Sequence, residues 1–338
     1  MAIREAIQKL VEHKSLSQDE ASAVMAEMME GQATPAQIGA FLVGLRLKTE
    51  SVDEIVGLAR VMRERAQRLS LADELVDTCG TGGDRSGTFN ISTTAAFVVA
   101  GLGVKVAKHG NRAASSGCGS ADVLEALGVK IALSPDGVRQ CLEQVGIGFM
   151  FAQTFHPAMR HVAGPRREIG VRTVFNILGP LTNPAGASRQ VIGVANPLLA
   201  PPMADALKLL GTKHSLLVCG GDGLDELSLS TSSTVWEVAS GRVKMYSVAP
   251  DAAGLPRAPT SALAGGTPQE NSAILQRVLE GEKGPRRDVV LLNAAAALIA
   301  ADRAPDLREG VQLAASSIDS GHAREKLQGL VKLSQTLQ

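Results

Sequence analysis

The sequence predicts an α/β protein in which a helical N-terminal region precedes a sheet covered on both faces. Three observations support this prediction. Capped helical segments fill the first part of the chain, short β-like runs alternate with helices after it, and glycine-rich turns follow the first two of these runs. Alternation of strands and helices is typical of an α/β sheet.

The N-terminal region contains the start signals of several helices. Ser17–Glu20 and Ser51–Glu54 match the capping box, in which a hydroxyl and a carboxylate satisfy free N–H groups of the first turn. Thr34-Pro35 begins a further helix with proline in its first turn. Apolar residues follow at spacings of three and four, so we expect these helices to pack together as one layer.

This helical layer carries more large apolar side chains than a thin layer is expected to bury. A second apolar face needs a partner, because large exposed apolar patches are uncommon on soluble monomers. The sequence therefore predicts a homodimer through the N-terminal helices, unless both faces pack within one chain. The residues concerned are Met25, Met28, Met29, Ile38, Phe41, Leu42 and Leu45.

Short apolar runs predict the strands of the second region, with helices between them. The expected strands are Leu75–Thr78, Val104–Ala107, Gln190–Val194 and Ser215–Val218, and a hairpin is expected over Val235–Ser247 with its turn at Ser240-Gly241. The expected helices are Thr94–Leu102, Asp122–Leu127 and Pro157–Ile169, and Pro250–Gln269 is expected to be a loop.

A glycine-rich turn, Gly80–Asp84, follows the first predicted strand. Glycine adopts positive φ at little cost, so such a turn can aim successive N–H groups into one anion-binding concavity. Thr88, Asn90, Ser92 and Thr93 then lead into an apolar helix, whose N-terminus favours phosphate. The turn matches neither GxxxxGK[ST] nor GxGxxG. A tight turn before a core helix is the alternative, but the hydroxyl-rich run favours a phosphate site.

A second loop, Lys108–Ser116, follows the next predicted strand. It combines two cations, an imidazole and an amide with two serines, and small residues continue to Ser120. Lys108 can supply a point charge to a phosphate and Arg112 a planar fork. A solvated basic turn is the alternative. Two separated loops of this kind indicate a ligand with two phosphate groups.

Three carboxylates lie in the turn Gly221–Glu226. Adjacent carboxylates suit Mg²⁺, which prefers oxygen ligands and often bridges substrate phosphates. An acidic turn that caps a helix is an equally good interpretation from spacing alone. Arg166 and Arg167 lie near the end of a predicted helix, where cations are favoured, so surface placement is the default for such a pair. Among the histidines, His109 is the best candidate for a catalytic group, but no general base is assigned.

Composition argues against several classes of protein. Lys+Arg and Asp+Glu both total 34, and aromatic residues make up 3% of the chain, which argues against a nucleic-acid partner. The longest apolar run is too short to cross a bilayer, so no membrane partner is expected. Four dispersed cysteines indicate reduced thiols and a cytoplasmic location.

These motifs together resemble the anthranilate phosphoribosyltransferases. The resemblance covers most of the chain, and KHGNR together with RTVFNILGPLTNP is its most specific part. The matching segments are GTGGD at 80–84, TFNIST at 88–93, KHGNR at 108–112 with SS at 115–116, GSADVLEALG at 119–128, HPAMRHVAGPRREIGVRTVFNILGPLTNPA at 156–185 and GLDELS at 223–228.

The resemblance implies a fold like that of nucleoside phosphorylases and phosphoribosyltransferases. A small helical domain is expected over 1–70, joined by a returning helical segment at about 157–185. A larger α/β domain with a central mixed sheet is expected over 71–156 and 186–338. The substrate cleft would lie between the two domains, and the family is mostly dimeric, which favours the homodimer.

The resemblance also implies the site residues. For phosphoribosyl pyrophosphate they are Gly80, Gly83, Asp84, Thr88, Asn90, Ile91, Ser92, Thr93, Lys108, His109, Gly110, Asn111, Arg112, Ala113, Ala114, Ser115, Ser116 and Ser120. For anthranilate they are Gly80, Asn111 and Arg166, and for Mg²⁺ they are Ser92, Asp225 and Glu226.

The implied reaction displaces pyrophosphate from the anomeric carbon of the sugar by the amine of anthranilate. A pyrimidine nucleoside phosphorylase, which shares the fold, is one alternative, although KHGNR argues against it. A non-catalytic relative that binds nucleic acid is the other, although the zero net charge and the intact motifs argue against it.

Overall fold

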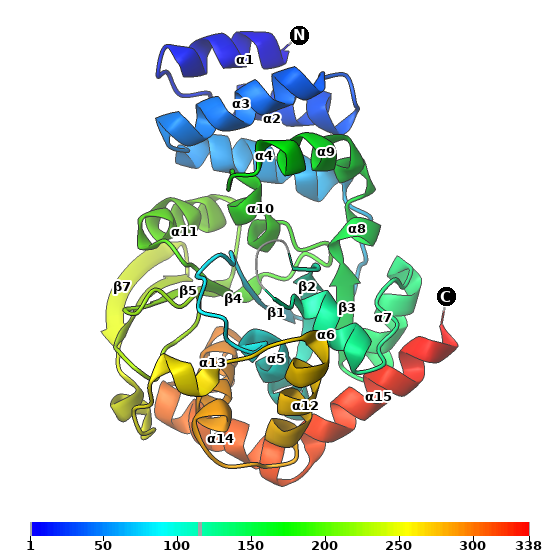
Figure 1. Cartoon of the computed structure of the whole chain (residues 1–338), viewed down its shortest axis with the longest axis vertical. Coiled ribbons are helices and arrows are strands. Elements are labelled where there is room, and N and C mark those ends of the chain that lie inside the picture. The colour runs from blue at the N-terminus through cyan, green and yellow to red at the C-terminus, as the bar shows by residue number, and fades with distance from the viewer. Residues whose placement is uncertain (1, 114–116, 338) are drawn as a thin grey trace.

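The computed structural model describes residues 2–113 and 117–337. Four helices form a layer at the N-terminal end, and the α/β body lies below them (Figure 1). The bounds of the four helices are α1 Ala2–Val11, α2 Gln18–Met29, α3 Pro35–Lys48 and α4 Val52–Arg65. The strands are β1 Leu75–Gly80, β2 Lys105–Gly110, β3 Ile147–Phe151, β4 Arg189–Gly193, β5 His214–Gly220, β6 Ser233–Ala239 and β7 Arg242–Val248.

The remaining helices surround the sheet and connect its strands. They are α5 Ile91–Gly101, α6 Ser120–Ala126, α7 Pro135–Gln144, α8 Ala152–Phe155, α9 Arg160–Ile169, α10 Phe175–Leu181, α11 Ala200–Leu209, α12 Pro268–Leu279, α13 Pro285–Ala300, α14 Leu307–Asp319 and α15 His322–Thr336. Short 3₁₀ turns lie at Pro157–Met159, Pro197–Leu199, Pro250–Ala253 and Thr260–Leu263.

The predicted helix starts are confirmed. The hydroxyls of Ser17, Thr34 and Ser51 each accept a hydrogen bond from the backbone N–H three residues later, and the reciprocal side-chain bond completes a capping box at all three. These caps set where α2, α3 and α4 begin, because they satisfy N–H groups that the first helical turn leaves free.

The sheet is mixed, as predicted. Its strand order is β3-β2-β1-β4-β5-β6-β7, with parallel pairing from β3 to β5 and antiparallel pairing in β5-β6 and β6-β7. The predicted hairpin turn is present: Ser240 and Gly241 have φ values of 50° and 72°. Positive φ at both central residues is the requirement of a tight two-residue hairpin turn.

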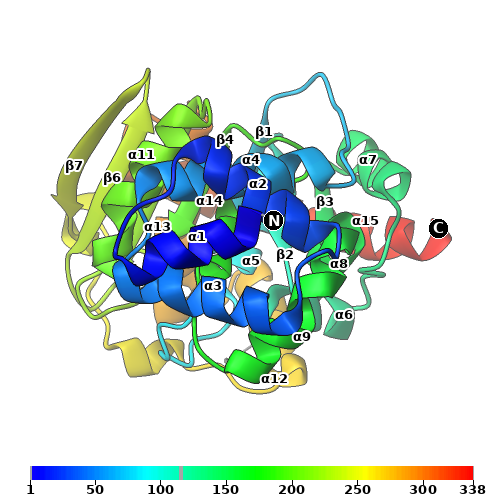
Figure 2. The ribbon, with the colours of Figure 1, turned by 90° about the horizontal axis from the view of Figure 1, so that it is seen from above.

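Two apolar cores cover the two faces of this sheet. Val191 and Leu216 face the core that contains α5 and α13, whereas Ile192 and Leu217 face the core that contains the N-terminal helices, α10 and α11. This alternation is the period-two pattern of a strand buried on both faces. Figure 2, seen from above, shows the helical layer lying over the sheet with the β6-β7 hairpin at one edge.

Two sequence expectations need correction. Strand β3 was not among the predicted strands, because a short continuous apolar run does not by itself distinguish a strand from a helix. The premise of the dimer prediction is wrong: the seven apolar side chains from Met25 to Leu45 are at most 3% exposed within a single chain. The N-terminal helices bury them against one another, α10 and the sheet. Among the described residues, no helix is long and apolar enough to span a membrane.

Candidate active site

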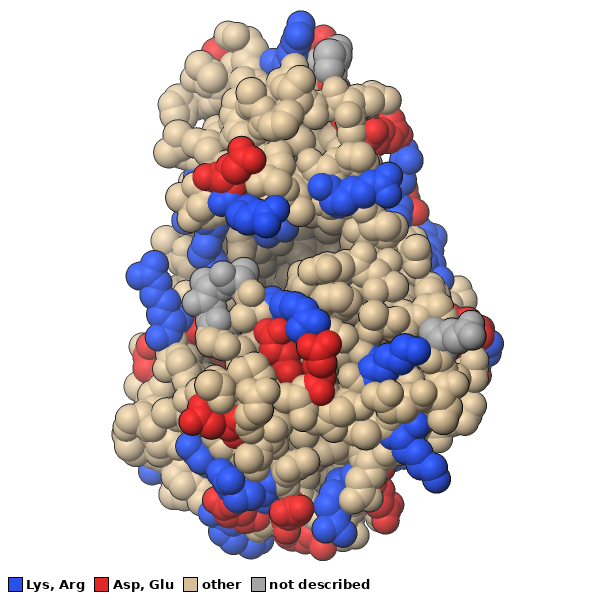
Figure 3. Space-filling view, turned by 45° about the vertical axis from the view of Figure 1, so that its right-hand side comes forward, with Lys and Arg blue, Asp and Glu red and all other residues tan. Residues whose placement is uncertain are grey.

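The predicted loops lie at the carboxyl ends of neighbouring strands. Gly80–Asp84 follows β1, Gly110–Ala113 follows β2, and the turn that ends in Glu226 follows β5. Ligands of open α/β sheets bind at this edge, because the loops from parallel strands converge there. Figure 3 shows the surface hollowed between the helical layer and the α/β body, with Lys and Arg side chains on both sides of the hollow.

The first loop is closed around a carboxylate that follows β5. The Gly82 N–H donates to Asp225 Oδ2 at 2.8 Å, and Gly82 and Gly83 have φ values of 62° and 82°. A Cβ on Gly80 would lie 2.6 Å from Asp225 Oδ2. The glycines are therefore required here, both for the conformation of the loop and for the close approach of Asp225.

The three residues predicted to bind Mg²⁺ lie together. The Ser92 N–H, in the first turn of α5, donates to Glu226 Oε1 at 3.1 Å, and Glu226 is the neighbour of Asp225. Burial, together with repulsion from Asp84, raises the pKa of Asp225 to about 7. Burial and repulsion from Asp225 raise the pKa of Glu226 to about 8. Two desolvated acids side by side form a site that a divalent cation would stabilise.

The third carboxylate of the turn has a different environment. Asp222 Oδ2 accepts hydrogen bonds from the hydroxyls of Ser228, Ser230 and Thr260 at 2.9, 2.5 and 2.7 Å. It therefore braces the turn. Within residues 2–113 and 117–337 no group of three or more His, Cys, Asp or Glu side chains could hold a metal. A cation would therefore depend on Asp225, Glu226, the Ser92 hydroxyl and oxygen atoms of its own ligand.

Lys108 lies beneath the loops. Its side chain is buried, its Nζ donates to the carbonyl of Thr78 on β1, and Asp77 and Glu226 are the carboxyl groups whose charge would act on it. Burial lowers the pKa of Lys108. The structure thus brings this cation toward β1 and the carboxylate pair, away from the outer part of the second loop.

The outer part of the second loop is organised by acids of α6. Arg112 pairs with Asp122 and Glu125 at 3.0 and 2.8 Å, and the Ala113 N–H donates to Asp122 at 2.9 Å. Ser120 Oγ donates to the Asn111 carbonyl at 3.4 Å. The predicted site residues Ala114, Ser115 and Ser116 lie outside the described residues.

Arg166 of α9 is half-buried and stacks on Phe175, with its guanidinium carbon 4.8 Å from the ring centroid. Burial lowers the pKa of Arg166, and no carboxylate in the described part of the chain forms an ion pair with it. Its neighbour Arg167 is exposed. A desolvated guanidinium without an anion is suited to a ligand carboxylate.

His109 is a poor proton acceptor in this structure. Its ring lies 5.2 Å from that of His156, and its Nδ1 lies 3.3 Å from the carbonyl of Gly179. Burial, reinforced by His156, lowers the pKa of His109 to about 3. Burial lowers the pKa of His156 to about 4. Both imidazoles are therefore neutral near pH 7, and a base this weak is poorly matched to proton transfer.

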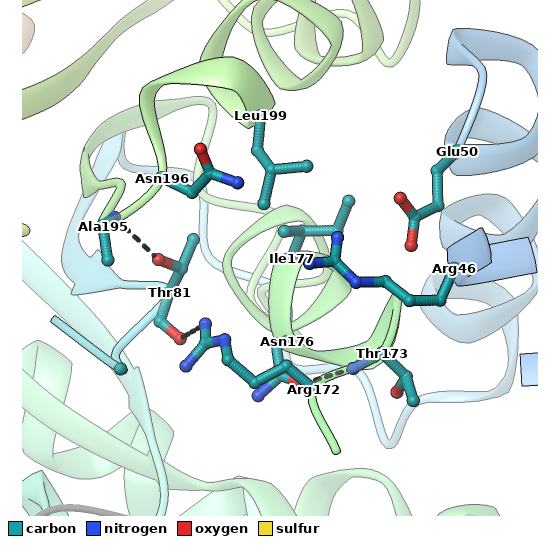
Figure 4. Close-up of a pocket in the computed structure, with 11 residues that line it drawn as sticks. Arg46, Glu50, Thr81, Arg172, Thr173, Asn176, Ile177, Ala195, Asn196 and Leu199 are labelled. Atoms are coloured by element: carbon teal, nitrogen blue, oxygen red, sulfur yellow. Dashed lines mark hydrogen bonds between the residues drawn. The ribbon is translucent and has the colours of Figure 1, made fainter. Parts of the chain in front are cut away.

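A pocket of about 150 Å³ is lined by Thr81 and Gly83 of the first loop (Figure 4). It was not predicted from the sequence. Arg172 Nη2 donates to the Thr81 carbonyl at 2.8 Å, and its Nη1 lies 1.7 Å from where a Gly83 Cβ would stand. Arg46 reaches in from α3, and Glu50, whose pKa burial raises, lies above it. Arg172 belongs to the RTVFNILGP segment, which was the sequence signal that could have pointed to this residue. Its contact with Thr81 joins residues 91 positions apart, so the sequence alone did not reveal it.

The helical layer, the mixed sheet and the loops at its carboxyl edge define a glycosyl transferase. The model described as "Glycosyl transferase family, a/b domain" matches residues 72–324, and the model described as "Glycosyl transferase family, helical bundle domain" matches residues 4–66. More particularly, the chain belongs to the anthranilate phosphoribosyltransferase family.

Relatives of that name match along the whole chain. One from Symbiobacterium thermophilum is 59% identical over 323 residues, which are 95% of each chain. One from Chloroflexus aurantiacus is 58% identical over 99% of each chain. The crystal structure of the Thermus thermophilus enzyme has a TM-score of 0.92 and 48% identity, over 98% of this chain and 99% of its own. The Saccharomyces cerevisiae enzyme, solved with PRPP and Mg, has a TM-score of 0.92 and 29% identity, over 99% and 98%.

Proposed function

We propose that this chain transfers the phosphoribosyl group of 5-phosphoribosyl 1-pyrophosphate to the amine of anthranilate. The products are N-(5-phosphoribosyl)anthranilate and pyrophosphate, and the step belongs to tryptophan biosynthesis. The observation that carries the proposal is the half-buried Asp225–Glu226 pair, held by the N–H groups of Gly82 and Ser92 at the edge where the phosphate loops converge.

Mg²⁺ fits this pair. Two adjacent, desolvated acids with raised pKa values are unfavourable as two free anions, and oxygen ligands of this kind are those that Mg²⁺ prefers. The yeast relative was solved with PRPP and Mg, and a variant of it was solved with Mg bound. Asp225, Glu226 and Ser92 would hold the ion, which would offset the charge that develops on the departing pyrophosphate.

The chain's own groups divide the remaining work. The first loop and the start of α5 would bind the donor through Gly80, Gly83, Asp84, Thr88, Asn90, Ile91, Ser92 and Thr93. The second loop would complete that site through Lys108, His109, Gly110, Asn111, Arg112 and the residues that follow to Ser120. The loops would exclude water and hold the anomeric carbon facing the acceptor, since orientation alone lowers a barrier substantially.

Arg166, Asn111 and Gly80 would bind anthranilate. The lone guanidinium of Arg166 would pair with the acceptor carboxylate and so direct the amine at the sugar. The yeast relative has been solved with 4-fluoroanthranilate. No strong base is assigned, in keeping with the lowered pKa of His109.

The division of the chain and its assembly are part of the proposal. We assign residues 1–70 and about 157–185 to a helical domain, and 71–156 and 186–338 to an α/β domain. The packing of α9 against α2 and α3, and of α10 against α4, supports this. A cytoplasmic homodimer is proposed through α3. Its outer face carries Ala36, Ala40, Val43 and Leu47, of which Leu47 is 75% exposed.

The metal pair offers a direct test of the proposal. The double variant Asp225→Asn/Glu226→Gln keeps the shapes of both side chains but removes their charges. We expect it to lose most of the anthranilate consumption that wild type shows with phosphoribosyl pyrophosphate and Mg²⁺. Asp222→Asn, in the brace of the same turn, is the control for local folding. Full activity of the double variant at limiting Mg²⁺ would remove the pair from the metal site.

A further inference from the structure

We propose that Asn271 is a positioning residue of the donor site, which orients the amide of Asn90 and ties the start of α5 to the segment that follows the second phosphate-binding loop. This inference rests on the proposed function, in which Asn90 contacts phosphoribosyl pyrophosphate. Asn271 lies in α12, outside both loops and 181 residues from Asn90. Helix α12 lies beside α5 and α6 in the fold (Figure 1).

A chain of three hydrogen bonds passes through this residue. The Gly266 N–H donates to Asn271 Oδ1 at 2.8 Å, Asn271 Nδ2 donates to Asn90 Oδ1 at 3.0 Å, and Asn90 Nδ2 donates to the Cys118 carbonyl at 3.1 Å. Asn271 is 2% exposed. These three hydrogen bonds join the segment before α12 to the start of α5 and to Cys118, which lies just before Gly119.

Both ends of this chain are backbone groups, which fixes the direction of every bond in it. The Gly266 N–H can only donate, so Asn271 must turn its oxygen toward it and its NH₂ toward Asn90. Asn90 must then present its oxygen to Asn271 and its NH₂ to the Cys118 carbonyl, which can only accept. The amide of Asn90 therefore has one satisfactory orientation, although asparagine amides are otherwise easily reversed.

This orientation determines what α5 offers to a ligand. Asn90 is the N-cap residue of α5, where an asparagine oxygen usually accepts from the first-turn N–H groups. Here it makes no such bond and accepts from Asn271 instead. The Asn90 side chain therefore does not use the N–H groups of the first turn of α5. One of them, the Ser92 N–H, already donates to Glu226. One N–H of the Asn90 NH₂ reaches Cys118, and an amide NH₂ has a second to donate.

The segment before Asn271 is itself fastened to the segment between the first loop and α5. The Phe89 N–H donates to the Leu263 carbonyl at 3.1 Å, and the Gly265 N–H donates to the Gly87 carbonyl at 2.9 Å. A Cβ on Gly265 would lie 2.8 Å from the backbone of Phe89. The C-terminal part of the chain thus sets the shape of the donor site without contributing a phosphate ligand.

The Asn271→Asp variant tests the inference, because it keeps the size of the side chain and still accepts from Gly266. The second oxygen of the new aspartate would face Asn90 Oδ1 and repel it. The Asn90 amide would then reverse, which would place its oxygen against the carbonyl oxygen of Cys118. We expect the KM for phosphoribosyl pyrophosphate to rise roughly tenfold, as is typical when a buried polar group loses its partner. The KM for anthranilate, measured at saturating donor, should stay within about twofold of wild type. Ser272→Ala, the next residue of α12, is the matched control.

A second variant keeps the test decisive if Asn271→Asp folds poorly. Asn271→Ala removes the relay without adding charge, and calorimetry with phosphoribosyl pyrophosphate and Mg²⁺ reads donor binding directly, whether or not the protein turns over anthranilate. Donor binding weakened by roughly tenfold in a folded variant supports the relay. Unchanged donor binding overturns the proposal. An equal loss of affinity for both substrates, accompanied by a fall in Tm, also overturns it. If the wild-type protein binds the donor but does not turn over anthranilate, the proposed function is contradicted, whereas the role of Asn271 in donor binding is not.

Discussion

At the scale of single residues, unpaired charge distinguishes the site from the rest of the molecule. On the surface, Arg112 and Arg139 each pair with two carboxylates. Arg166 instead lies against an aromatic ring, and Asp225 and Glu226 lie beside each other, half-buried, with raised pKa values. Ionisable groups with shifted pKa values and no ion-pair partner are typical of sites that a ligand completes.

Arg166 gives the first prediction at this scale. Arg166→Met keeps an apolar stem over Phe175 but removes the charge, so the KM for anthranilate should rise roughly tenfold to hundredfold. The KM for phosphoribosyl pyrophosphate should change little, as measured by steady-state kinetics. Arg167→Met, one residue away on the exposed side, is the control. A normal anthranilate KM with a weakened donor would show that Arg166 serves the other substrate.

The buried imidazoles predict a pH dependence of stability. Because burial lowers the pKa of His156 to about 4, only the unfolded chain binds this proton as pH falls from about 6.5 toward 4. Stability from this residue is therefore complete above pH 6.5 and is lost by about 1.4 kcal/mol per pH unit below it. Urea denaturation at pH 7 and pH 5 measures the free energy of unfolding at each pH. Between these two pH values, His156→Asn should lose about 2 kcal/mol less of that free energy than wild type does. Exposed His13→Asn should match wild type, and parallel losses in all three proteins would contradict the prediction.

At the scale of elements, the half-buried cation Arg63 joins the helical layer to α10 and α11. Arg63 of α4 donates through Nε to the Leu181 carbonyl at 2.7 Å and through Nη1 to the Leu210 carbonyl at 3.3 Å. These carbonyls lie at the C-terminal ends of α10 and α11, where helix dipoles favour positive charge. Burial lowers the pKa of Arg63 to about 10, so the side chain keeps its charge at pH 7.

Removal of this contact should weaken the packing of the helical layer on the body. Arg63→Met leaves two helix-terminal carbonyls without their donor, and we expect the free energy of unfolding to fall by roughly 2 kcal/mol. Denaturant unfolding checks the value. Arg60→Met, on the exposed side of the same helix, should change it by less than about 0.5 kcal/mol. Equal effects of the two substitutions would show that Arg63 is not the fastening residue.

The sequence predicted elements where local chemistry determines them. Capping boxes located α2 and α4, Thr34-Pro35 located α3, and Ser240-Gly241 located the hairpin turn, because each signal depends on residues a few positions apart. The apolar run of β3 carries no such local signal. Arg172 on Thr81 and Asn271 on Asn90 are contacts between residues that are far apart in sequence, so only the folded chain reveals them.

At the scale of the whole molecule, the apolar surface left on the helical layer bears on assembly. We expect light scattering at micromolar concentration to give twice the 35.1 kDa mass of one chain. Leu47→Glu should shift that mass toward the monomer, because it places a charge on the exposed face of α3. Met245→Glu, on the exposed strand β7, is the matched control and should leave the mass unchanged. A fully active wild-type protein at 35.1 kDa would contradict the dimer.

The substrates themselves test the central claim most directly. Wild-type protein is incubated with anthranilate, phosphoribosyl pyrophosphate and Mg²⁺, and the loss of anthranilate fluorescence is followed beside a parallel assay of thymidine phosphorolysis. The account predicts that fluorescence falls only when donor and Mg²⁺ are both present, that pyrophosphate appears in equal amount, and that thymidine is untouched. Thymidine cleavage by inorganic phosphate, with anthranilate left unchanged, would contradict the account.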